Sequence, residues 1–301
     1  MPLSVSSPPL GLVGVGLLGS VLAERLFAGG FALLGFDLDA ARLEAFRALG
    51  GHAAADAREI FQRCNRVLLS LPSHKEVTAL ISAHLDALRP GAILIDTTTG
   101  DPSMSATLAR DLAAHGAAYL DATVSGSSAQ VREGLAVMMV GGDTAAYTAC
   151  ADIFSCLGGA TFHTGPSGSG ARMKLATNLV LGLNRAALAE GLAFARGLGL
   201  DPAQALAIMR AGPAYSRVMD RKGEKMLRGD FTPEARLSQH LKDVRLILEH
   251  GHAAGLALPL STAHRALLER AEAAGLGALD NSALIRVLEG GGGAPPGGGP
   301  S

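Results

Sequence analysis

The stretch GPSGSGARMKLATNLVLGLN, residues 165–184, contains one lysine, Lys174, and no other formally charged residue lies between Arg172 and Arg185. A solvated helix face normally mixes charged and apolar residues, so an isolated lysine here is unusual. Desolvation lowers the pKa of a lysine and makes it a usable proton donor and acceptor near neutral pH. The alternative is a lysine whose stem lies along an apolar face, and the stretch alone leaves both interpretations open.

Asn178 follows Lys174 by four residues, so in a helix the two side chains lie on one face, one turn apart. Gly168 and Gly170 precede this helix. Its start can therefore come close to another backbone or to a ligand.

A second candidate site is the glycine pattern G-x-G-x-x-G, which directly follows an apolar run and directly precedes a helical one. Glycine lets the backbone approach a pyrophosphate, whose charge then lies at the positive end of the following helix. Asp37 ends the next apolar run, where a dinucleotide fold needs a carboxylate for the adenosine ribose. The predicted coenzyme contacts of the turn are Gly14, Gly16, Leu17, Leu18 and Gly19.

The acidic residues after this second run also indicate which coenzyme is bound. Asp37 and Asp39 would repel the 2′-phosphate of NADP, and the residue between them is Leu38 rather than an arginine. The sequence therefore favours NAD over NADP.

Short apolar runs alternate with helical stretches in the first half of the chain, which predicts βαβ units and a mostly parallel sheet. Strands are expected at Leu10–Val15, Leu33–Phe36, Val67–Leu71, Ala92–Asp96, Ala118–Asp121, Ala136–Val140 and Thr161–Thr164. From Ala171 onward the pattern is helical, with one apolar stripe at Leu237, Leu241, Val244 and Leu248. The expected fold is an α/β Rossmann-type domain followed by an all-α domain.

We expect a dinucleotide-binding domain over residues 1–166 and an all-α domain for substrate binding and dimerisation over 167–289, opening with a long interdomain helix. Residues 290–301 hold seven Gly and three Pro, too little apolar surface to offset the entropy of ordering. This tail is predicted to be disordered.

Composition narrows the possible partners. A formal net charge of −1 gives no electrostatic reason for binding nucleic acid or anionic membranes. The uncharged run Leu10–Gly19 is too short to cross a bilayer and no Lys or Arg precedes it, so a cytoplasmic protein is expected.

Three cysteines without C-x-x-C spacing indicate reduced thiols. No metal site is expected, since His250 and His252 have no cluster of carboxylate or Cys ligands near them in the sequence.

Several segments together resemble the β-hydroxyacid dehydrogenases, the family that includes 3-hydroxyisobutyrate dehydrogenase and tartronate semialdehyde reductase. They occur in the family's order and extend to about residue 289: GLVGVGLLG, SLP (70–72), DTTTGDP (96–102), DATVSGSSAQVREG (121–134), GPSGSGARMKLATN (165–178) and LKD (241–243). The loop at 121–127 departs from the family's usual DAPVSGG at Thr123 and Ser127, which affects the prediction of substrate choice.

The resemblance assigns roles to individual residues. It implies that Lys174 is the general acid and base and that Asn178 orients the reacting oxygen. Ser125 and Gly126, with the neighbouring Ser127, would bind the acid group of the substrate in a small-residue loop at a strand end.

Further coenzyme contacts are implied at Leu71, Pro72, Thr99 and Lys242, the last reaching toward the nicotinamide and closing the cleft between the domains. On sequence alone, Thr99 is equally a cap for the helix that begins near Ser103, and Lys242 is more simply a solvated neighbour of Asp243.

The sequence thus predicts an NAD-dependent enzyme that interconverts a small 3-hydroxy acid and its semialdehyde, acting as a homodimer or homotetramer. An imine reductase and a non-catalytic NAD-binding scaffold or sensor are the alternatives kept open. A short-chain reductase is excluded because no tyrosine stands four residues before a lysine, and a hydrolase because no G-x-S-x-G occurs.

Overall fold

The structure is a computed structural model that describes residues 8–290. By its internal contacts the chain divides into two compact units after Lys174, within helix α9 (Ser169–Gly197). Most of the predicted disordered tail, residues 291–301, lies outside the described residues.

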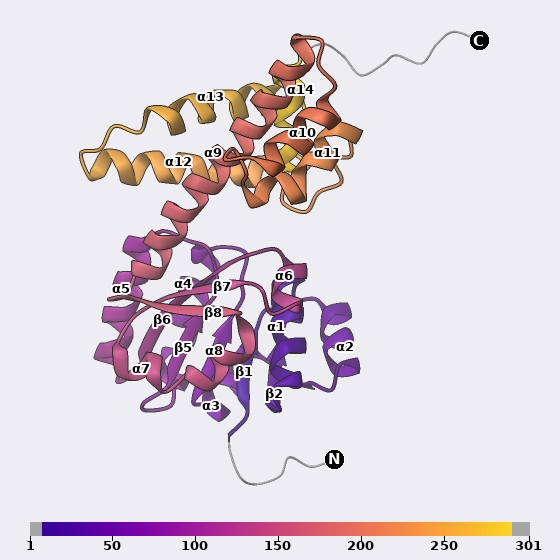
Figure 1. Ribbon diagram of the computed structural model, residues 1–301. Helices are drawn as coiled ribbons and strands as arrows, with labels where there is room; N and C mark the ends of the chain where they lie inside the picture. The colour runs from indigo at the N-terminus through magenta and orange to yellow at the C-terminus, as the bar shows by residue number, and fades with distance from the viewer. Residues whose placement is uncertain (1–7, 291–301) are drawn as a thin grey trace. The chain divides into compact units, whose positions relative to one another are not determined.

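A sheet covered by helices forms the centre of the first unit (Figure 1). It has eight strands in the order β3-β2-β1-β4-β5-β6-β7-β8. All neighbouring strands pair in parallel except β6 and β7, which are antiparallel. The strands are β1 (Leu10–Val13), β2 (Leu33–Phe36), β3 (His52–Ala53), β4 (Arg66–Leu69), β5 (Ile93–Asp96), β6 (Ala118–Ser125), β7 (Val137–Gly141) and β8 (Ala160–Gly165). The predicted mostly parallel sheet is confirmed.

All seven expected strands are present, most with ends shifted by one or two residues, and the structure differs from the prediction more clearly in two places. The pair His52–Ala53 adds β3 at the sheet edge, and two residues are too few to show a period of two in a sequence. Strand β6 was predicted to end at Asp121 but continues to Ser125, because residues 121–125 pair with β7.

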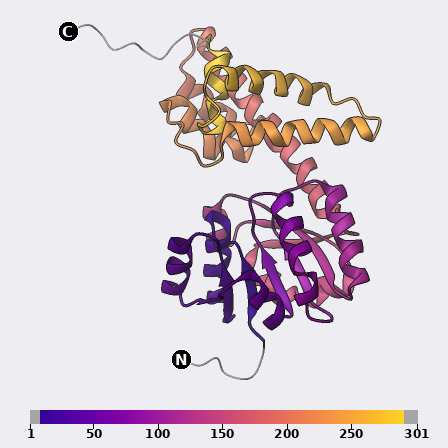
Figure 2. The same cartoon turned by 180° about the vertical axis from the view of Figure 1, so that it is seen from behind.

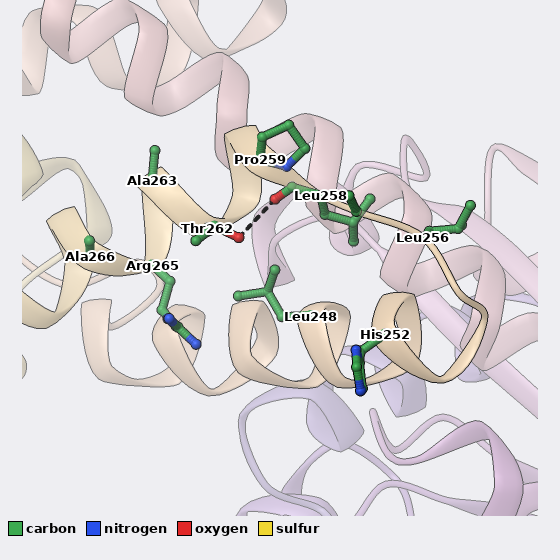
Figure 3. Close-up of a pocket in the computed structure, with 10 residues that line it drawn as sticks. Leu248, His252, Leu256, Leu258, Pro259, Thr262, Ala263, Arg265 and Ala266 are labelled. Carbon is green, nitrogen blue, oxygen red and sulfur yellow. Dashed lines mark hydrogen bonds between the residues drawn. The ribbon is translucent and has the colours of Figure 1, made fainter.

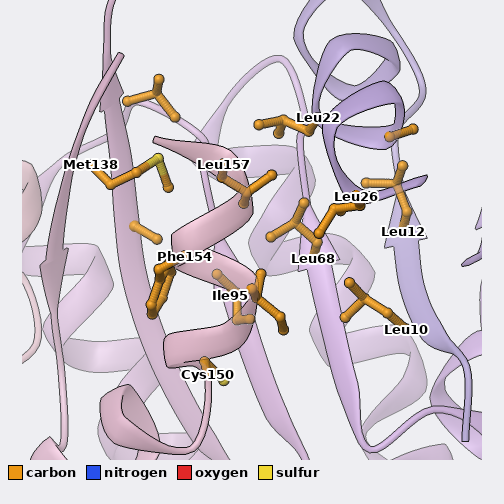
Figure 4. Packing of buried hydrophobic residues seen from close by; sticks show 14 of the residues in the cluster. Leu10, Leu12, Leu22, Leu26, Leu68, Ile95, Met138, Cys150, Phe154 and Leu157 are labelled. Carbon is orange, nitrogen blue, oxygen red and sulfur yellow. The ribbon is translucent and has the colours of Figure 1, made fainter. Parts of the chain in front are cut away.

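Helices cover both faces of this sheet. They are α1 (Leu17–Ala28), α2 (Ala40–Ala48), α3 (Ala57–Arg63), α4 (His74–His84), the short 3-10 turn η1 (Leu85–Ala87), α5 (Pro102–Ala114), α6 (Ser128–Arg132), α7 (Thr144–Thr148) and α8 (Ala151–Leu157). Successive residues of a strand point to opposite faces. Leu68 packs with α1 and α8 (Figure 4), whereas Val67 and Leu69 pack with α3, α4 and α5 on the other face. Because both faces are covered, the strands read as unbroken apolar runs.

The three cysteines are free thiols and all lie in the first unit. Burial raises the pKa of Cys64 to about 12 and that of Cys150 to about 11. Cys156 is half-buried.

The second unit is helical (Figure 2), and the predicted α/β-then-α fold class is confirmed. After α9 come α10 (Pro202–Ala211), the π-helical turn η2 (Met219–Gly223), α11 (Glu224–Arg228), α12 (Leu237–Ala253), α13 (Pro259–Ala273), the 3-10 turn η3 (Asn281–Leu284) and α14 (Ile285–Leu288). The stripe predicted on α12 packs into the core, with Leu237, Leu241 and Val244 buried and Leu248 partly buried.

Two histidines meet inside this unit. The rings of His240 on α12 and His264 on α13 are 5.2 Å apart between centroids, and both side chains are buried. Gly182 on α9 lies against them, since a Cβ there would be 2.7 Å from His240 Nε2. The guanidinium of Arg185, also buried, acts on both imidazoles electrostatically.

The same unit also contains a buried ion pair. Lys222 Nζ donates to Asp280 Oδ2 at 3.0 Å, and the Asp280 carboxylate also accepts from the backbone N–H groups of Glu234, Ala235 and Ser282. Asp280 is fully buried. Hydrogen bonds from Ser282 and Glu234 and the Lys222 ammonium, which together outweigh burial, hold the pKa of Asp280 well below its usual value.

Candidate functional site

Strands β1, β4, β5 and β6 run parallel, so their carboxyl ends meet at one edge of the sheet. The chain order reverses between β1 and β4, and in open α/β sheets ligands bind outside the strand ends at such a point. The loops touch there: a Cβ on Gly14 would lie 2.2 Å from Ser70 O, and Leu71 N donates to Thr98 Oγ1 at 3.2 Å. Most of the predicted site residues follow these four strands.

The three glycines of the predicted coenzyme turn have different surroundings. Gly14 has a φ of +92°, and Gly19 packs so tightly that a Cβ would be 2.0 Å from Gly14 O. Both are therefore required by the fold itself. Gly16 differs, because a Cβ there would meet only the Arg42 side chain, at 3.4 Å. The backbone of Gly16, which is partly buried, is thus the part of the turn that a ligand can approach.

Helix α1 begins at this turn with Gly16 as its N-cap, and no described side chain makes a capping hydrogen bond there. Leu17, the first helical residue, is 80% exposed, while Leu18 is partly buried. N–H groups at an uncapped helix start favour an anion, and the helix dipole adds to that preference. A coenzyme pyrophosphate fits this position.

Asp37 immediately follows β2, at the edge where the glycine turn lies. Its carboxylate accepts from Val15 N and from Asp39 N, both at 2.9 Å, so it also ties the turn to the next strand. A carboxylate offers about four acceptor positions, which leaves capacity for ribose hydroxyls.

Arg42 is a feature of the site that sequence reasoning missed. Its Nη1 lies 3.7 Å from Asp37 Oδ2 and its Nε lies 3.4 Å from Asp39 Oδ2, and half of its side chain is exposed. The prediction considered only the residue between the two aspartates. The signal available in the sequence was a basic residue one helical turn beyond Asp39.

The predicted contacts after β4 and β5 lie at the same edge. Leu71 is partly buried, Pro72 is exposed and Thr99 is partly buried. The interpretation of Thr99 as a helix cap is wrong, because Asp101 is the N-cap of α5 and its carboxylate accepts from Ser103 N at 2.8 Å. Thr99 is thereby not used by the helix.

The predicted substrate loop begins at the end of β6. Ser125 is the last strand residue, and Gly126 has a φ of +150°, a conformation that side chains rarely adopt. Ser127 caps the short helix α6 through a reciprocal capping box with Gln130. Its hydroxyl therefore has a structural role, whereas the Ser125 hydroxyl is at the turn itself.

Lys174 lies beside this loop. Its Nζ donates to Val124 O at 2.7 Å, and Val124 directly precedes Ser125. The side chain is partly buried. The predicted proton-transfer amine and the predicted carboxylate loop are thus brought together by α9 and β6, although 50 residues separate Lys174 from Val124.

Two buried aspartates on β5 and β6 belong to the motifs at 96–102 and 121–134, but the sequence predicted no role for either. Asp96 and Asp121 are register partners on β5 and β6. Asp96 accepts from Tyr119 Oη at 2.6 Å and from Thr98 N at 2.9 Å. Burial raises the pKa of both carboxyl groups, and burial beside Asp96 raises that of Tyr119. A hint in the sequence is that each aspartate ends an apolar run before a small-residue loop.

Asn178 and Lys242 belong to the second unit. Asn178 is buried, and its Nδ2 donates to Asp243 Oδ2 at 3.3 Å, so Asp243 orients the carboxamide. Lys242, the preceding residue on α12, is exposed.

A hollow of about 650 Å³ lies elsewhere in the second unit, between α12 and α13, with Leu248, Leu256 and Leu258 on its walls (Figure 3). None of the predicted site residues lines it. Over residues 8–290 no group of three His, Cys, Asp or Glu side chains is arranged to hold a metal ion. No helix in that part of the chain is long and apolar enough to cross a membrane.

Comparison with known proteins covers nearly the whole chain. Residues 9–165 match a family model described as the NAD binding domain of 6-phosphogluconate dehydrogenase. Residues 168–288 match one described as NAD-binding of NADP-dependent 3-hydroxyisobutyrate dehydrogenase.

Relatives include L-threonate dehydrogenase of Cupriavidus necator, 30% identical over 93% of this chain and 96% of its own length. The cytokine-like nuclear factor N-PAC of Xenopus tropicalis is also 30% identical, over 92% of this chain and 53% of its own length. A crystal structure of 3-hydroxyisobutyrate dehydrogenase from Salmonella typhimurium has a TM-score of 0.85 at 24% identity, covering 93% of this chain and all of that one. At this identity the structural match bears on the fold alone.

Proposed function

This chain belongs to the β-hydroxyacid dehydrogenase family, and from that membership we propose that it is an NAD-dependent dehydrogenase of a small 3-hydroxy acid. The reaction interconverts the hydroxy acid, of the 3-hydroxyisobutyrate kind, and its semialdehyde. The observation that carries the proposal is the 2.7 Å hydrogen bond from Lys174 Nζ to Val124 O. It supports an amine held next to the loop that would bind the substrate's acid group.

Different residues of the chain would bind the substrate, transfer the proton and orient the reacting oxygen. The Ser125 hydroxyl and the backbone at Gly126 hold the carboxylate of the substrate. Lys174 takes the proton of the substrate hydroxyl during oxidation and returns it during reduction, and Asn178 orients that oxygen. The hydride acceptor or donor would be supplied by a bound nicotinamide coenzyme. Positioned proton transfer is typically worth about 10²–10⁴ in rate.

The coenzyme would lie along the edge formed by the glycine turn and the loops after β4 and β5. Gly16 and the uncapped start of α1 would bind the pyrophosphate, and Asp37 would bind the adenosine ribose. The rest of the coenzyme would contact Leu71, Pro72 and Thr99. The family resemblance also assigns Lys242 to the nicotinamide end.

A panel of C3 to C5 hydroxy acids, including threonate, with NADH formation as the readout, tests the activity. Lys174→Ala should lower kcat at least about a hundredfold while NAD still binds. Arg172→Ala, an exposed change on the same helix, is the matched control and should leave turnover near normal. Normal turnover by the Lys174 variant would remove this amine from the mechanism.

Preference for NAD rests on Asp37, whose charge opposes a 2′-phosphate. Arg42 favours NADP instead, because its positive guanidinium lies 3.7 Å from the Asp37 carboxylate and offsets that negative charge. We propose that Asp37 dominates, since its carboxylate is fixed by two backbone N–H groups whereas Arg42 is half-exposed. A higher kcat/KM with NADP than with NAD would contradict this assignment, and Arg42→Ala should widen the preference for NAD.

A homodimer or homotetramer is part of the same proposal. It is supported by exposed apolar side chains of the second unit, among them Phe194 on α9 and Ile208 on α10, at 67% and 65% exposure. Sedimentation equilibrium measures the assembly directly, and a monomer at micromolar concentration would exclude it.

A non-catalytic NAD-binding protein is the second candidate, because one relative of similar identity is named as a nuclear factor rather than an enzyme. Lys174 and the loop around Ser125 argue against it, since a pure binder does not need a proton-transfer amine. The two candidates differ in one result: tight NAD binding with no turnover on any substrate of the panel would favour the binder.

A further inference from the structure

Strand β6 contacts the first two turns of helix α9 at three successive places. The Asp121 carboxylate accepts from Gly168 N at 2.7 Å and from Ala171 N at 2.8 Å. Thr123 Oγ1 donates to Gly170 O at 3.1 Å. The third contact is the one from Lys174 Nζ to Val124 O.

Asp121 takes the place of a local helix cap. The first N–H groups of a helix have no partner within it, and Gly168, just before α9, has no side chain to supply one. Both oxygens of Asp121 are used instead, one for each N–H group, and the side chain is 2% exposed. A negative charge at this position is also favoured by the helix dipole.

Thr123 makes a contact that the usual residue of the family cannot make. The DAPVSGG pattern of the resemblance has proline at this position, and proline has no hydroxyl. The Thr123 hydroxyl is also 3.3 Å from Met139 O, so it lies between β7 and the start of α9. Strand β6 and the start of α9 are in close contact here, because a Cβ on Gly170 would be 2.4 Å from Asp121 O.

Lys174 is one helical turn beyond Gly170, so whatever fixes the first turn of α9 also fixes the direction of the lysine stem. We propose that Asp121 and Thr123 are positioning residues that hold Lys174 Nζ at the end of β6. This inference rests on the function proposed for Lys174.

Thr123→Val tests the inference, because it removes the hydroxyl while keeping the shape of a β-branched side chain. We expect kcat to fall about fivefold, which corresponds to the ~1 kcal/mol typical of one neutral hydrogen bond, with KM for NAD unchanged. Thr123→Ser keeps the hydroxyl and should restore most of the rate. Asp121→Asn places an NH₂ group against a backbone N–H and should lower kcat further than Thr123→Val does.

In a Lys174→Ala background, neither change should lower the residual rate by more than about twofold, since both act through the amine. Equal losses in both backgrounds would overturn the inference. So would unchanged kcat for a folded Thr123→Val variant.

A readout independent of turnover separates this inference from the proposed function. Trace acetylation followed by mass spectrometry measures how fast Lys174 reacts, with the exposed Lys75 on α4 as the internal reference. Loss of positioning in Thr123→Val should raise the rate at Lys174 relative to Lys75 at least twofold. That increase in a protein without dehydrogenase activity would support the positioning and contradict the function, and an unchanged ratio would refute the positioning.

Discussion

His264 and His240 should make the helical unit lose stability as pH falls from about 6.5 toward 4. Burial, followed by the charge of Arg185, lowers the pKa of His264 to about 4, and the same causes lower that of His240 well below the usual value. In the unfolded chain the pKa of each imidazole is about 6.5. The unfolded state therefore binds more protons between these values, so the stability is complete above about pH 6.5 and is lost as pH falls toward 4.

The expected loss follows from these values. At about 1.4 kcal/mol for each pKa unit, His264 alone should lower the free energy of unfolding by about 2 kcal/mol between pH 7 and pH 5. His240 adds in the same direction. Urea unfolding followed by far-ultraviolet circular dichroism at both pH values measures the difference. His264→Leu, which keeps the volume and removes the titrating group, should lose less on acidification.

His252→Leu is the matched control, because His252 is exposed on the same helix as His240, and it should leave the pH dependence intact. Asp280 does not interfere: its lowered pKa affects stability only below about pH 3.8. A wild-type protein equally stable at pH 7 and pH 5, or a His264→Leu variant with the full pH dependence, would refute the reasoning that a neutral imidazole is buried here.

Two further predictions concern the glycine turn and the buried ion pair. Gly19→Ala should lower the melting temperature, because the new Cβ would lie 2.0 Å from a backbone oxygen. Gly16→Ala should leave the melting temperature unchanged and weaken NAD binding. The reverse pattern would contradict the assignment of the turn. Lys222→Met should cost about 3 kcal/mol in urea unfolding, since Asp280 would keep a buried charge without its cation, and Lys225→Met, which does not contact Asp280, should cost clearly less.

The sheet was predictable because both its faces are covered. Each parallel strand then appears as a continuous apolar run, and the glycine turn marks where the first run ends. The extension of β6 was not predictable, since residues 122–125 (Ala-Thr-Val-Ser) are too few and too mixed in polarity to indicate a strand and become one by pairing with β7. A two-residue strand such as β3 leaves no pattern at all.

The candidate site was predicted as a set of motifs but not as a set of contacts. Lys174 was recognisable by its isolation among apolar residues, yet its partner is a backbone carbonyl, and any residue type supplies one. Asp121 and Thr123 act on α9 from a distant strand, so nothing near either residue signals that role. The histidine pair joins helices α12 and α13, and only the packed unit brings the rings together.

The placement of the cysteines supplies a reporter that needs no engineering. Cys64 and Cys150 are buried inside the first unit, where burial raises the pKa of both thiols, and the helical unit has no cysteine. A thiol reagent added under native conditions would thus modify these two sites only when the sheet opens. Alkylation kinetics and circular dichroism, recorded on one sample, would show whether the halves of the chain melt together or in sequence.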